Sequence, residues 1–558
     1  MTATAQSPAA VPGLWRRQLE HYPDTRPRVT YLAIVVLATI ALYYANYIPG
    51  AVAPSIIAHY GMTFPTYVYI IVIANAVGAF GSLLAGLSDR WGRANLVAYG
   101  LVLVGLLVLF GVPNAPNTFT YGLLFSIVGI VEGIILVATP ALVRDFSPQL
   151  GRASAMGFWT LGPVLGSLVV AVVSSNTLSH LVAWQDQFII CGIAVLVVGV
   201  IAVVFLRELS PELRDQLMVS FRDRALLEAR ARGLDVSELL RKPWRQMLRL
   251  DIIGSAFAIS VFLLVYYTAV GFFTIYFTTL HGFTESKANS IGNWFWAFDA
   301  AALIIVGIVS DRVRVRKPFM VVGAVGAAVM TIVFLNLGAG TTYSTFVVVI
   351  SILAVFLAIA YAPWMASYTE TVEKHNPALT AHGLAIWGWI IRAVIAISFL
   401  IMPAVVGSMT PLVTYGTQVS TLAAKYAPEI ATGAVIDPTT QAQLAANPLN
   451  PAADTKAVTE IATAFKISPA AATARFTALA TVPKADQAFL AAHGTQVTTA
   501  AAAAPGQWKN WWWVSVAGEI VFIPLILLMA GRWSPRKARE DAEEHDRLVQ
   551  EEMAKLEA

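Results

Sequence analysis

Residues 85–93 read AGLSDRWGR, and residues 307–317 read GIVSDRVRVRK. Both stretches end an apolar run and both contain Ser-Asp-Arg, with Asp89 and Asp311 lying 222 positions apart (311 − 89). Pro140 and Pro363, which we expect to close two later apolar runs, lie 223 positions apart (363 − 140). Repeats at a matched offset indicate two copies of one structural unit, so we expect two similar halves.

The composition is that of a membrane protein. Of 558 residues, 57% are hydrophobic and 13% are charged, whereas soluble domains carry roughly 25% charged residues. Soluble cores cannot bury this many apolar side chains. The composition therefore predicts a polytopic membrane protein. The net charge of +4 is too small over this length to suggest a phosphate-binding face, and nucleic acid is not an expected partner.

The residue types also exclude several kinds of chemistry. A single cysteine, Cys191, rules out disulfide frameworks and paired-thiol redox chemistry. The sequence has no Gly-x4-Gly-Lys-Ser/Thr loop, so ATP is not an expected partner, and it has no His-Glu-x-x-His zinc motif. We therefore predict no metal, no cofactor and no enzymatic activity.

The chain is predicted to be an all-α membrane protein with twelve transmembrane helices in two pseudo-symmetric six-helix bundles. A helix needs about 20 apolar residues to cross a bilayer. Runs of this kind centre on 31–53, 66–88, 95–112, 119–141, 154–174, 186–206, 252–279, 289–310, 318–338, 344–366, 382–406 and 511–531.

These runs set the predicted domain boundaries. We expect an amphipathic cytoplasmic linker and an Ala-rich extracytoplasmic insertion, which is either a lid over the outer opening or an inert addition. The predicted segments are 1–30 (cytoplasmic N-terminal segment), 31–206 (first bundle), 207–250 (linker), 251–409 (helices seven to eleven), 410–510 (insertion), 511–531 (helix twelve) and 532–558 (charged cytoplasmic tail).

Basic residues collect in alternate loops. Arg90 and Arg93 follow the second span, and Arg144 and Arg152 follow the fourth, whereas the loops at 54–65, 113–118 and 339–343 contain no Lys or Arg. The positive-inside rule therefore predicts that both termini are cytoplasmic, in a multi-pass protein of the plasma (inner) membrane.

The repeated loop resembles the signature of the major facilitator superfamily, in which a glycine, an acid and a base are followed by a second glycine and further bases. Two of its glycine positions differ here, at Ala85 and Arg314. The resemblance covers roughly 30–409 and 511–531, and it implies a secondary transporter that moves a small molecule through the lipid bilayer by alternating access. In this interpretation a latch between the halves is formed by Asp89, Arg90, Arg93, Asp311 and Arg312. Acids that only compensate nearby arginines are the alternative.

A second motif lies in the fifth span. Gly162, Pro163 and Gly166 resemble the Gly-Pro-x-x-Gly core of a motif found in proton-coupled exporters of the superfamily. The same residues also permit close helix packing and a kink. Gly129 stands where many proton-linked relatives have arginine, which argues against the familiar drug-exporter proton relay.

Four ionisable residues fall within predicted spans, where charge is costly unless paired or hydrated. Our hypothesis is that Arg392 binds an anionic substrate group through its planar donors. Asp299 or Glu132 is then the proton-coupling carboxylate. The alternative is a structural Asp299–Arg392 ion pair, and Glu519 is the weakest functional candidate of the four.

Polar and aromatic residues on the predicted cavity-lining helices complete the expected substrate site, namely Tyr44, Asn293, Trp296 and Trp387. The favoured function is transport of a small organic anion or carboxylated metabolite, coupled to protons or to a counter-anion. A proton-coupled exporter of hydrophobic compounds and a non-transporting membrane sensor are the alternatives.

Overall fold

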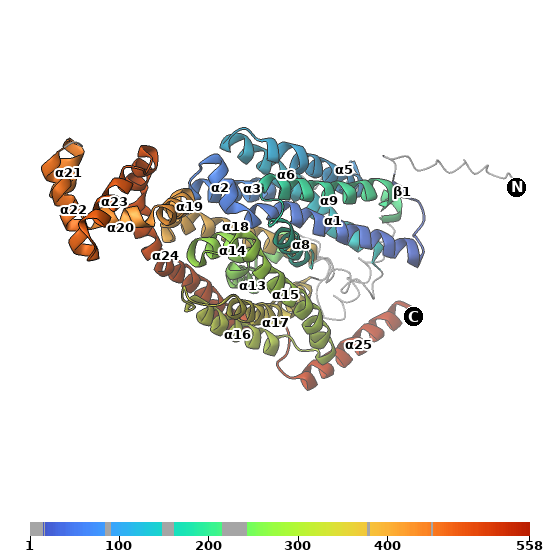
Figure 1. Ribbon diagram of the computed structural model, residues 1–558. Helices are drawn as coiled ribbons and strands as arrows, with labels where there is room; N and C mark the ends of the chain where they lie inside the picture. The colour runs from blue at the N-terminus through green and yellow to red at the C-terminus, as the bar shows by residue number, and fades with distance from the viewer. Residues whose placement is uncertain are drawn as a thin grey trace. The chain divides into compact units, whose positions relative to one another are not determined.

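The computed structural model describes residues 15, 17–83, 91–147, 161–214, 243–376, 380–447 and 450–557. Almost all regular structure in these ranges is helical (Figure 1). The first half contains α1 (Thr25–Ala51), α2 (Ala53–Tyr60), α3 (Phe64–Leu83), α5 (Arg93–Leu106), a π turn (Leu107–Gly111), a 3-10 turn (Val112–Asn114), α6 (Thr118–Phe146), α8 (Gly162–Thr177) and α9 (Trp184–Phe205).

The second half contains α12 (Pro243–Met247), α13 (Leu250–Phe262), α14 (Leu264–His281), α15 (Glu285–Val313), α16 (Lys317–Leu335), α17 (Tyr343–His375) and α18 (Thr380–Val405). Helix α24 (Lys484–Leu525), a 3-10 turn (Ile526–Leu528) and α25 (Pro535–Glu557) end the chain.

Within the described ranges, eleven helical segments are long and apolar enough to cross a membrane. The predicted all-α membrane fold is therefore confirmed. The predicted fifth span, 154–174, extends into residues that are not described, and its described part is the apolar helix α8. Helices α13 and α14 follow each other directly and together make one span, Leu250–His281.

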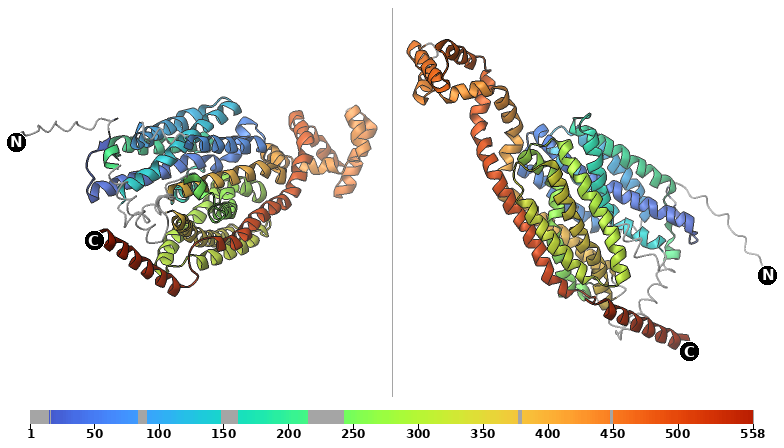
Figure 2. Two further views of the ribbon diagram at one scale, coloured as in Figure 1. Left: turned by 180° about the vertical axis from the view of Figure 1, so that it is seen from behind. Right: turned by 60° about the horizontal axis from the view of Figure 1, so that its bottom comes forward.

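The helices pack in a repeated pattern. In the first half α3 and α5 pack on α6, and in the second half α15 and α16 pack on α17 in the same way. The halves meet where α8 contacts α15, α3 contacts α18 and α1 contacts α14 (Figures 1 and 2). This arrangement is consistent with two related halves, and it puts the middle parts of α1, α6, α14 and α18 near one another.

Glycines let α3 and α6 approach each other closely. A Cβ on Gly78 would lie 2.7 Å from the carbonyl oxygen of Gly129, and a Cβ on Gly133 would overlap the carbonyl oxygen of Gly78. Small residues at membrane helix contacts allow the backbones to touch and gain packing energy. A Cβ on Gly129 itself would lie 2.5 Å from the carbonyl oxygen of Ala74, so this contact has no room for an arginine side chain at position 129.

Two expected helix boundaries are wrong. Pro140 and Pro363 lie inside α6 and α17 rather than at their ends, because neighbouring helices and water can satisfy the backbone groups that proline frees. Pro163 lies in the first turn of α8 as described, a position that proline favours because the missing N–H has no helical partner there.

A short parallel strand pair holds the ends of the first half together. Strand β1 (Gln18–Leu19) pairs with β2 (Glu208–Leu209). Arg17 is fully buried and donates to the carbonyl oxygens of Ala202 and Leu206 at the end of α9, at 2.9 and 3.3 Å. The N-terminal segment and the start of the predicted linker are therefore one structural element, whereas linker residues 215–242 lie outside the described residues.

The chain also contains a second compact unit, Gly407–Gln507. It contains α19 (Met409–Lys425), α20 (Ala427–Ala434), α21 (Pro438–Ala446), α22 (Pro451–Phe465), α23 (Pro469–Leu479) and the start of α24. Ile436, Ala457, Ile461 and Ala472 form a buried apolar cluster within it. A core of its own means that this insertion is a small folded helical unit.

Candidate functional site

Residues from both halves form a polar and aromatic group in the middle of the membrane helices, which we call the central cluster. It consists of Tyr43 and Tyr47 on α1, Glu132 on α6, Tyr266 and Tyr267 on α14, Asp299 on α15, Tyr361 on α17 and Arg392 on α18. Tyr43, Tyr47, Tyr267, Tyr361 and Arg392 are half-buried. Each of them also interacts electrostatically with a residue of the opposite half, so the central cluster lies where the two halves meet.

Glu132 and Arg392 come from opposite halves and interact electrostatically. Glu132 is 7% exposed, and its Oε1 accepts a hydrogen bond from Asn46 Nδ2 at 3.1 Å. Arg392 comes from the other half and lies within electrostatic range of Glu132. Among the described residues Arg392 has no hydrogen bond and no ion pair within 4.0 Å, so its donors are free to bind a ligand.

Two tyrosines flank this pair. Tyr43 and Tyr267 both lie within electrostatic range of Arg392. Tyr43 stacks at an angle on Tyr47, with ring centroids 5.3 Å apart. Two phenol groups therefore lie within electrostatic range of the guanidinium.

Asp299 lies in a separate part of the cluster. It is 3% exposed, has no ion pair within 4.0 Å in the described ranges, and interacts with Tyr266 and Tyr361 rather than with Arg392. The structural Asp299–Arg392 ion pair considered above is therefore absent. Of the two carboxylates, only Glu132 is within electrostatic range of the guanidinium.

The other predicted substrate residues lie in different places. Trp296 packs against Tyr266, with ring centroids 5.0 Å apart, and so borders the central cluster. Tyr44 is 2% exposed and interacts with Cys191 on α9, so it points into the first half. Trp387 packs on Trp364, with centroids 5.4 Å apart, inside the second half.

Asn293 lies at a contact between the halves, where its Nδ2 donates to Ser175 Oγ at 2.9 Å. Glu519 is fully buried inside the second half, where its Oε1 accepts from Thr331 Oγ1 at 2.8 Å. Tyr43, Tyr47 and Tyr267 are also expected from the sequence as aromatic residues on cavity-lining helices, whereas Tyr361 is not. Periodicity along α1 was the available signal, since Tyr43 and Tyr47 are one turn apart and share a face.

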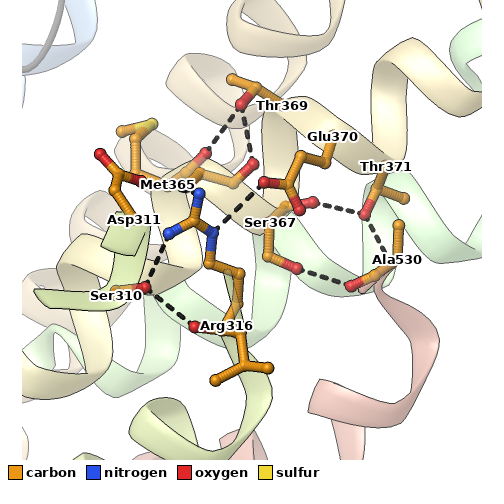
Figure 3. Close-up of polar contacts among 11 residues, drawn as sticks. Ser310, Asp311, Arg316, Met365, Ser367, Thr369, Glu370, Thr371 and Ala530 are labelled. Carbon is orange, nitrogen blue, oxygen red and sulfur yellow. Dashed lines mark hydrogen bonds and ion pairs between the residues drawn. The ribbon is translucent and has the colours of Figure 1, made fainter. Parts of the chain in front are cut away.

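Two of the five residues predicted to latch the halves, Arg93 and Asp311, each form an ion pair within one half. Arg93 Nη1 contacts Asp145 Oδ2 at 2.7 Å, joining α5 to α6. In the second half Arg316 contacts Asp311 Oδ1 at 2.8 Å and Glu370 Oε1 at 3.2 Å, which joins the end of α15 to α17 (Figure 3). Arg312 has no ion pair within 4.0 Å in the described chain, and Asp89 and Arg90 lie outside the described residues.

These pairs repeat between the halves. Arg93 and Arg316 each stand at the start of a third helix, and Asp145 and Glu370 each lie near the end of a fourth helix. An arginine–carboxylate pair of this kind ties adjacent helices by charge-assisted hydrogen bonds. In this conformation the repeated charges therefore stabilise each bundle separately.

Gly162 and Gly166 lie where α8 meets α1. A Cβ on Gly162 would lie 2.5 Å from Thr39 Cγ2, and a Cβ on Gly166 would lie 2.6 Å from Tyr43 Cβ. Tyr43 is part of the central cluster, so this close helix contact also fixes the position of one wall of the site.

Glu208 holds the start of α5. Its buried Oε2 accepts from the backbone N–H of Arg93 at 2.6 Å, which satisfies a helix-terminal donor. Burial raises the pKa of Glu208, while the backbone N–H groups of Arg93 and Ala94 oppose that rise. A raised pKa means that the stabilising contribution is present at low pH and is lost as the pH rises through the folded-state value.

A Glu208→Gln variant tests this contact. Its amide oxygen still accepts from Arg93 N–H, but it does not become charged in the buried site. As the pH rises from about 4, the ordinary glutamate pKa, through the raised folded-state value, we expect the thermal midpoint of the wild type to fall relative to that of the variant. Equal pH profiles for the two proteins in detergent would show that Glu208 does not titrate in this way.

Comparisons with known proteins agree with the fold. The family model described as Major Facilitator Superfamily matches residues 35–398. Among solved structures, a bacterial homolog of the human lysosomal transporter Spinster matches with a TM-score of 0.55 and 16% identity, covering 92% of this chain and 100% of that one. A D-xylose-proton symporter matches with a TM-score of 0.53 and 15% identity, covering 67% and 89%.

Curated relatives match over shorter stretches. The efflux pump radE of Floropilus chiversii is 25% identical over 46% of this chain and 49% of its own length. The putative glycerol-3-phosphate transporter 5 of Arabidopsis thaliana is 29% identical over 23% and 27%. The glucose-6-phosphate exchanger SLC37A2 of Danio rerio is 24% identical over 48% and 58%. The chain thus spans about half or less of the length of the first two relatives.

Proposed function

The chain belongs to the major facilitator superfamily of secondary transporters, and we propose that it carries a small organic anion or carboxylated metabolite by alternating access. We further propose that it does so in the plasma membrane with both termini cytoplasmic, as loop charge indicates. Arg392 binds the anionic group, and Glu132 carries the coupling proton.

One observation carries this proposal: Arg392 is half-buried, has no ion pair within 4.0 Å among the described residues, and interacts electrostatically with the carboxylate of Glu132 from the other half. An uncompensated charge in the hydrocarbon layer is costly. In the empty site the negative Glu132 offsets Arg392. When a monoanion binds to Arg392, protonation of Glu132 keeps the net charge of the site unchanged, so the proton and the anion bind together.

The surroundings of Arg392 support an organic rather than an inorganic anion. Tyr43 and Tyr267 lie within electrostatic range of the guanidinium, and aromatic rings with a few placed polar groups are typical of organic ligand sites. Two of the curated relatives are named for transport of phosphorylated metabolites, which are also anions.

A proton-coupled exporter of hydrophobic compounds is the second candidate. It is supported by the efflux pump among the relatives and by the many aromatic rings around the central cluster. The exporter function gives no role to the half-buried guanidinium of Arg392, because a cationic or neutral hydrophobic substrate does not need a positively charged binding group.

The test uses purified protein in liposomes with an imposed proton gradient. The panel sets small carboxylates, aromatic acids and organic phosphates against hydrophobic cations, and internal pH and current are recorded. Proton uptake evoked by an anion supports the proposal. A response to hydrophobic cations alone supports the exporter, and no response to any member of the panel supports a non-transporting sensor.

A Glu132→Gln variant tests the coupling step. The amide keeps an acceptor for Asn46 but does not release a proton. We therefore expect it to retain anion exchange between the two sides and to lose anion-evoked proton uptake by about 100-fold. Asp299→Asn is the matched control, since Asp299 does not share the field of Arg392. Loss of coupling in Asp299→Asn, with coupling kept in Glu132→Gln, would reassign the proton to Asp299.

A further inference from the structure

Three basic side chains of the second half come together at the ends of three membrane helices. Lys317 is the first residue of α16, Lys374 lies in the last turn of α17, and Arg532 follows the 3-10 turn that comes after α24. Lys317 lies within electrostatic range of both Lys374 and Arg532. We call these three residues the basic triad. Like charges at close range repel one another, so the triad favours a bound anion.

The acids of this region leave the triad only partly compensated. Asp311 and Glu370 both pair with Arg316 (Figure 3). Asp541 accepts from Nε and Nη2 of Arg532 at 2.6 and 3.2 Å, and Nη1 of Arg532 makes no hydrogen bond to a described residue. The two lysines of the triad have no ion pair within 4.0 Å in the described part of the chain. Two ammonium groups and one guanidinium nitrogen therefore remain available to an anion.

Burial makes the missing anion costly at Lys317. This residue is only 7% exposed. Its Nζ lies 5.8 Å from the ring centroid of Trp533, and an aromatic ring offsets only part of the cost of a desolvated ammonium group. Lys374 is exposed, so the triad can be reached from outside the protein. An anion bound there would compensate the buried charge.

The loop that carries Arg532 is held in place by α17. Ser367 Oγ donates to the carbonyl oxygen of Ala530 at 2.9 Å, and the backbone N–H of Ala530 donates to Thr371 Oγ1 at 2.9 Å (Figure 3). Gly531 then turns the chain with a φ of 104°, a conformation that suits glycine. Fixed backbone contacts therefore bring Arg532 to the end of α17 that carries Lys374.

The triad lies at the depth of the lipid headgroups. The candidate spans begin at Lys317, end at His375 and end at Leu528, so the three basic residues stand at or just beyond the ends of the apolar layer. The adjoining surface of α16 is apolar and exposed. It carries Val322, Val325, Val329 and Val333, which are spaced by three or four residues and so share one face.

Two further features indicate a lipid at this place. Leu527 is 66% exposed, in the 3-10 turn that packs against α16. Residues 532–539 follow the last span and contain four basic residues and no acid. Basic segments directly after a membrane helix attract anionic lipid headgroups. Trp533, which is 49% exposed, adds the aromatic side chain that is typical of the membrane interface.

From these contacts we infer that Lys317, Lys374 and Arg532 bind the phosphate group of an anionic phospholipid, whose acyl chains lie along the exposed valines of α16. Free phosphate shares the chemistry of the headgroup, but it has no acyl chains to cover the apolar face, so the lipid is the better occupant. The site is separate from the central cluster, and the inference does not depend on the substrate or on the coupling ion proposed above.

The test measures lipid binding to the purified full chain in detergent. Native mass spectrometry gives the dissociation constant of the first bound molecule of phosphatidylglycerol, with phosphatidylcholine as the neutral-headgroup comparison. Lys317→Gln and Lys374→Gln each remove one charge of the triad. Lys509→Gln is the matched control, because Lys509 Nζ donates to Asn336 Oδ1 at 2.7 Å at the opposite end of α16.

We expect the wild type to bind phosphatidylglycerol more tightly than phosphatidylcholine. Each triad variant should bind phosphatidylglycerol about fivefold more weakly, which is the effect of one basic residue near an anionic headgroup. The affinity of Lys509→Gln should equal that of the wild type. Inorganic phosphate and glycerol 3-phosphate, added at the concentration of the lipid, should not displace it.

Equal wild-type affinities for the two lipids, or wild-type affinity for phosphatidylglycerol in Lys374→Gln, would overturn the lipid site. Lys374 is exposed, so its replacement keeps the test valid even if Lys317→Gln does not fold. Displacement of the lipid by either soluble phosphate would assign the triad to a soluble anion and would also overturn the proposal. No transport is measured, so failure of the liposome panel leaves these results unchanged.

Discussion

Replacing Arg392 with alanine is expected to lower anion-evoked transport by about 100-fold or more, because each charge-assisted bidentate contact is strong in a site that excludes bulk water. Arg392→Lys should recover only part of the activity, since an ammonium group keeps the charge but not the planar fork of donors. Initial uptake rates in liposomes, measured across anion concentrations, check both variants.

Arg249→Ala is the control for this experiment. Arg249 is exposed and lies 3.9 Å from Asp251, where an ion pair adds little, so normal uptake is expected. Uptake by Arg392→Ala at the wild-type rate would contradict the anion site. A response to hydrophobic cations that survives in Arg392→Ala would make the exporter the better candidate.

Gly133→Val is expected to produce the largest loss of stability. Any Cβ at this position overlaps the carbonyl oxygen of Gly78, and backbone atoms move only if α3 and α6 separate. Overpacking of a tight contact costs about 1–3 kcal/mol or more, and here the cost falls on the wall that carries Glu132. A lower thermal midpoint in detergent and lower yield in the membrane are the measurements.

Gly307→Ala is the matched control in another membrane helix. No atom lies within 4 Å of a Cβ built on Gly307, so only helix propensity changes, and alanine is favoured over glycine by roughly 0.5–1 kcal/mol. This variant should equal or exceed the wild type in thermal midpoint. Similar losses in Gly133→Val and Gly307→Ala would show that the α3–α6 contact is not the cause.

Sequence reasoning predicted much of the architecture because the bilayer imposes simple rules. A span must be long and apolar, and its backbone groups must form hydrogen bonds within the helix. The membrane-spanning helices can therefore be located directly from the apolar runs in the sequence. Intramembrane charges can also be recognised in the sequence, because an ionisable side chain in the hydrocarbon layer costs free energy and is therefore a functional candidate. Glu132, Asp299 and Arg392 were selected on this ground, and all three lie in the central cluster.

The contacts of these residues were not readable. Spacing along α15 and α18 allowed Asp299 and Arg392 to meet, but their rotation about the helix axes instead turns Arg392 toward Glu132 on the other half. A rotation of one residue position turns a side chain by about 100°, which is enough to exchange one partner for another. The same uncertainty led to Tyr44 being selected instead of Tyr43.

The latch shows a second limit. The sequence determined that Asp89 and Asp311 are repeated, that basic residues follow them, and that the chain has two membrane halves of a secondary transporter. Only the tertiary structure decided that Asp311 and Arg316 bind within one half and that Lys317 lies within electrostatic range of Lys374 and Arg532. The reason is physical. The hydrophobic periodicity of a helix and the free-energy cost of an intramembrane charge depend on the residue's own segment. The partner of a side chain depends on how helices that are distant in sequence pack together.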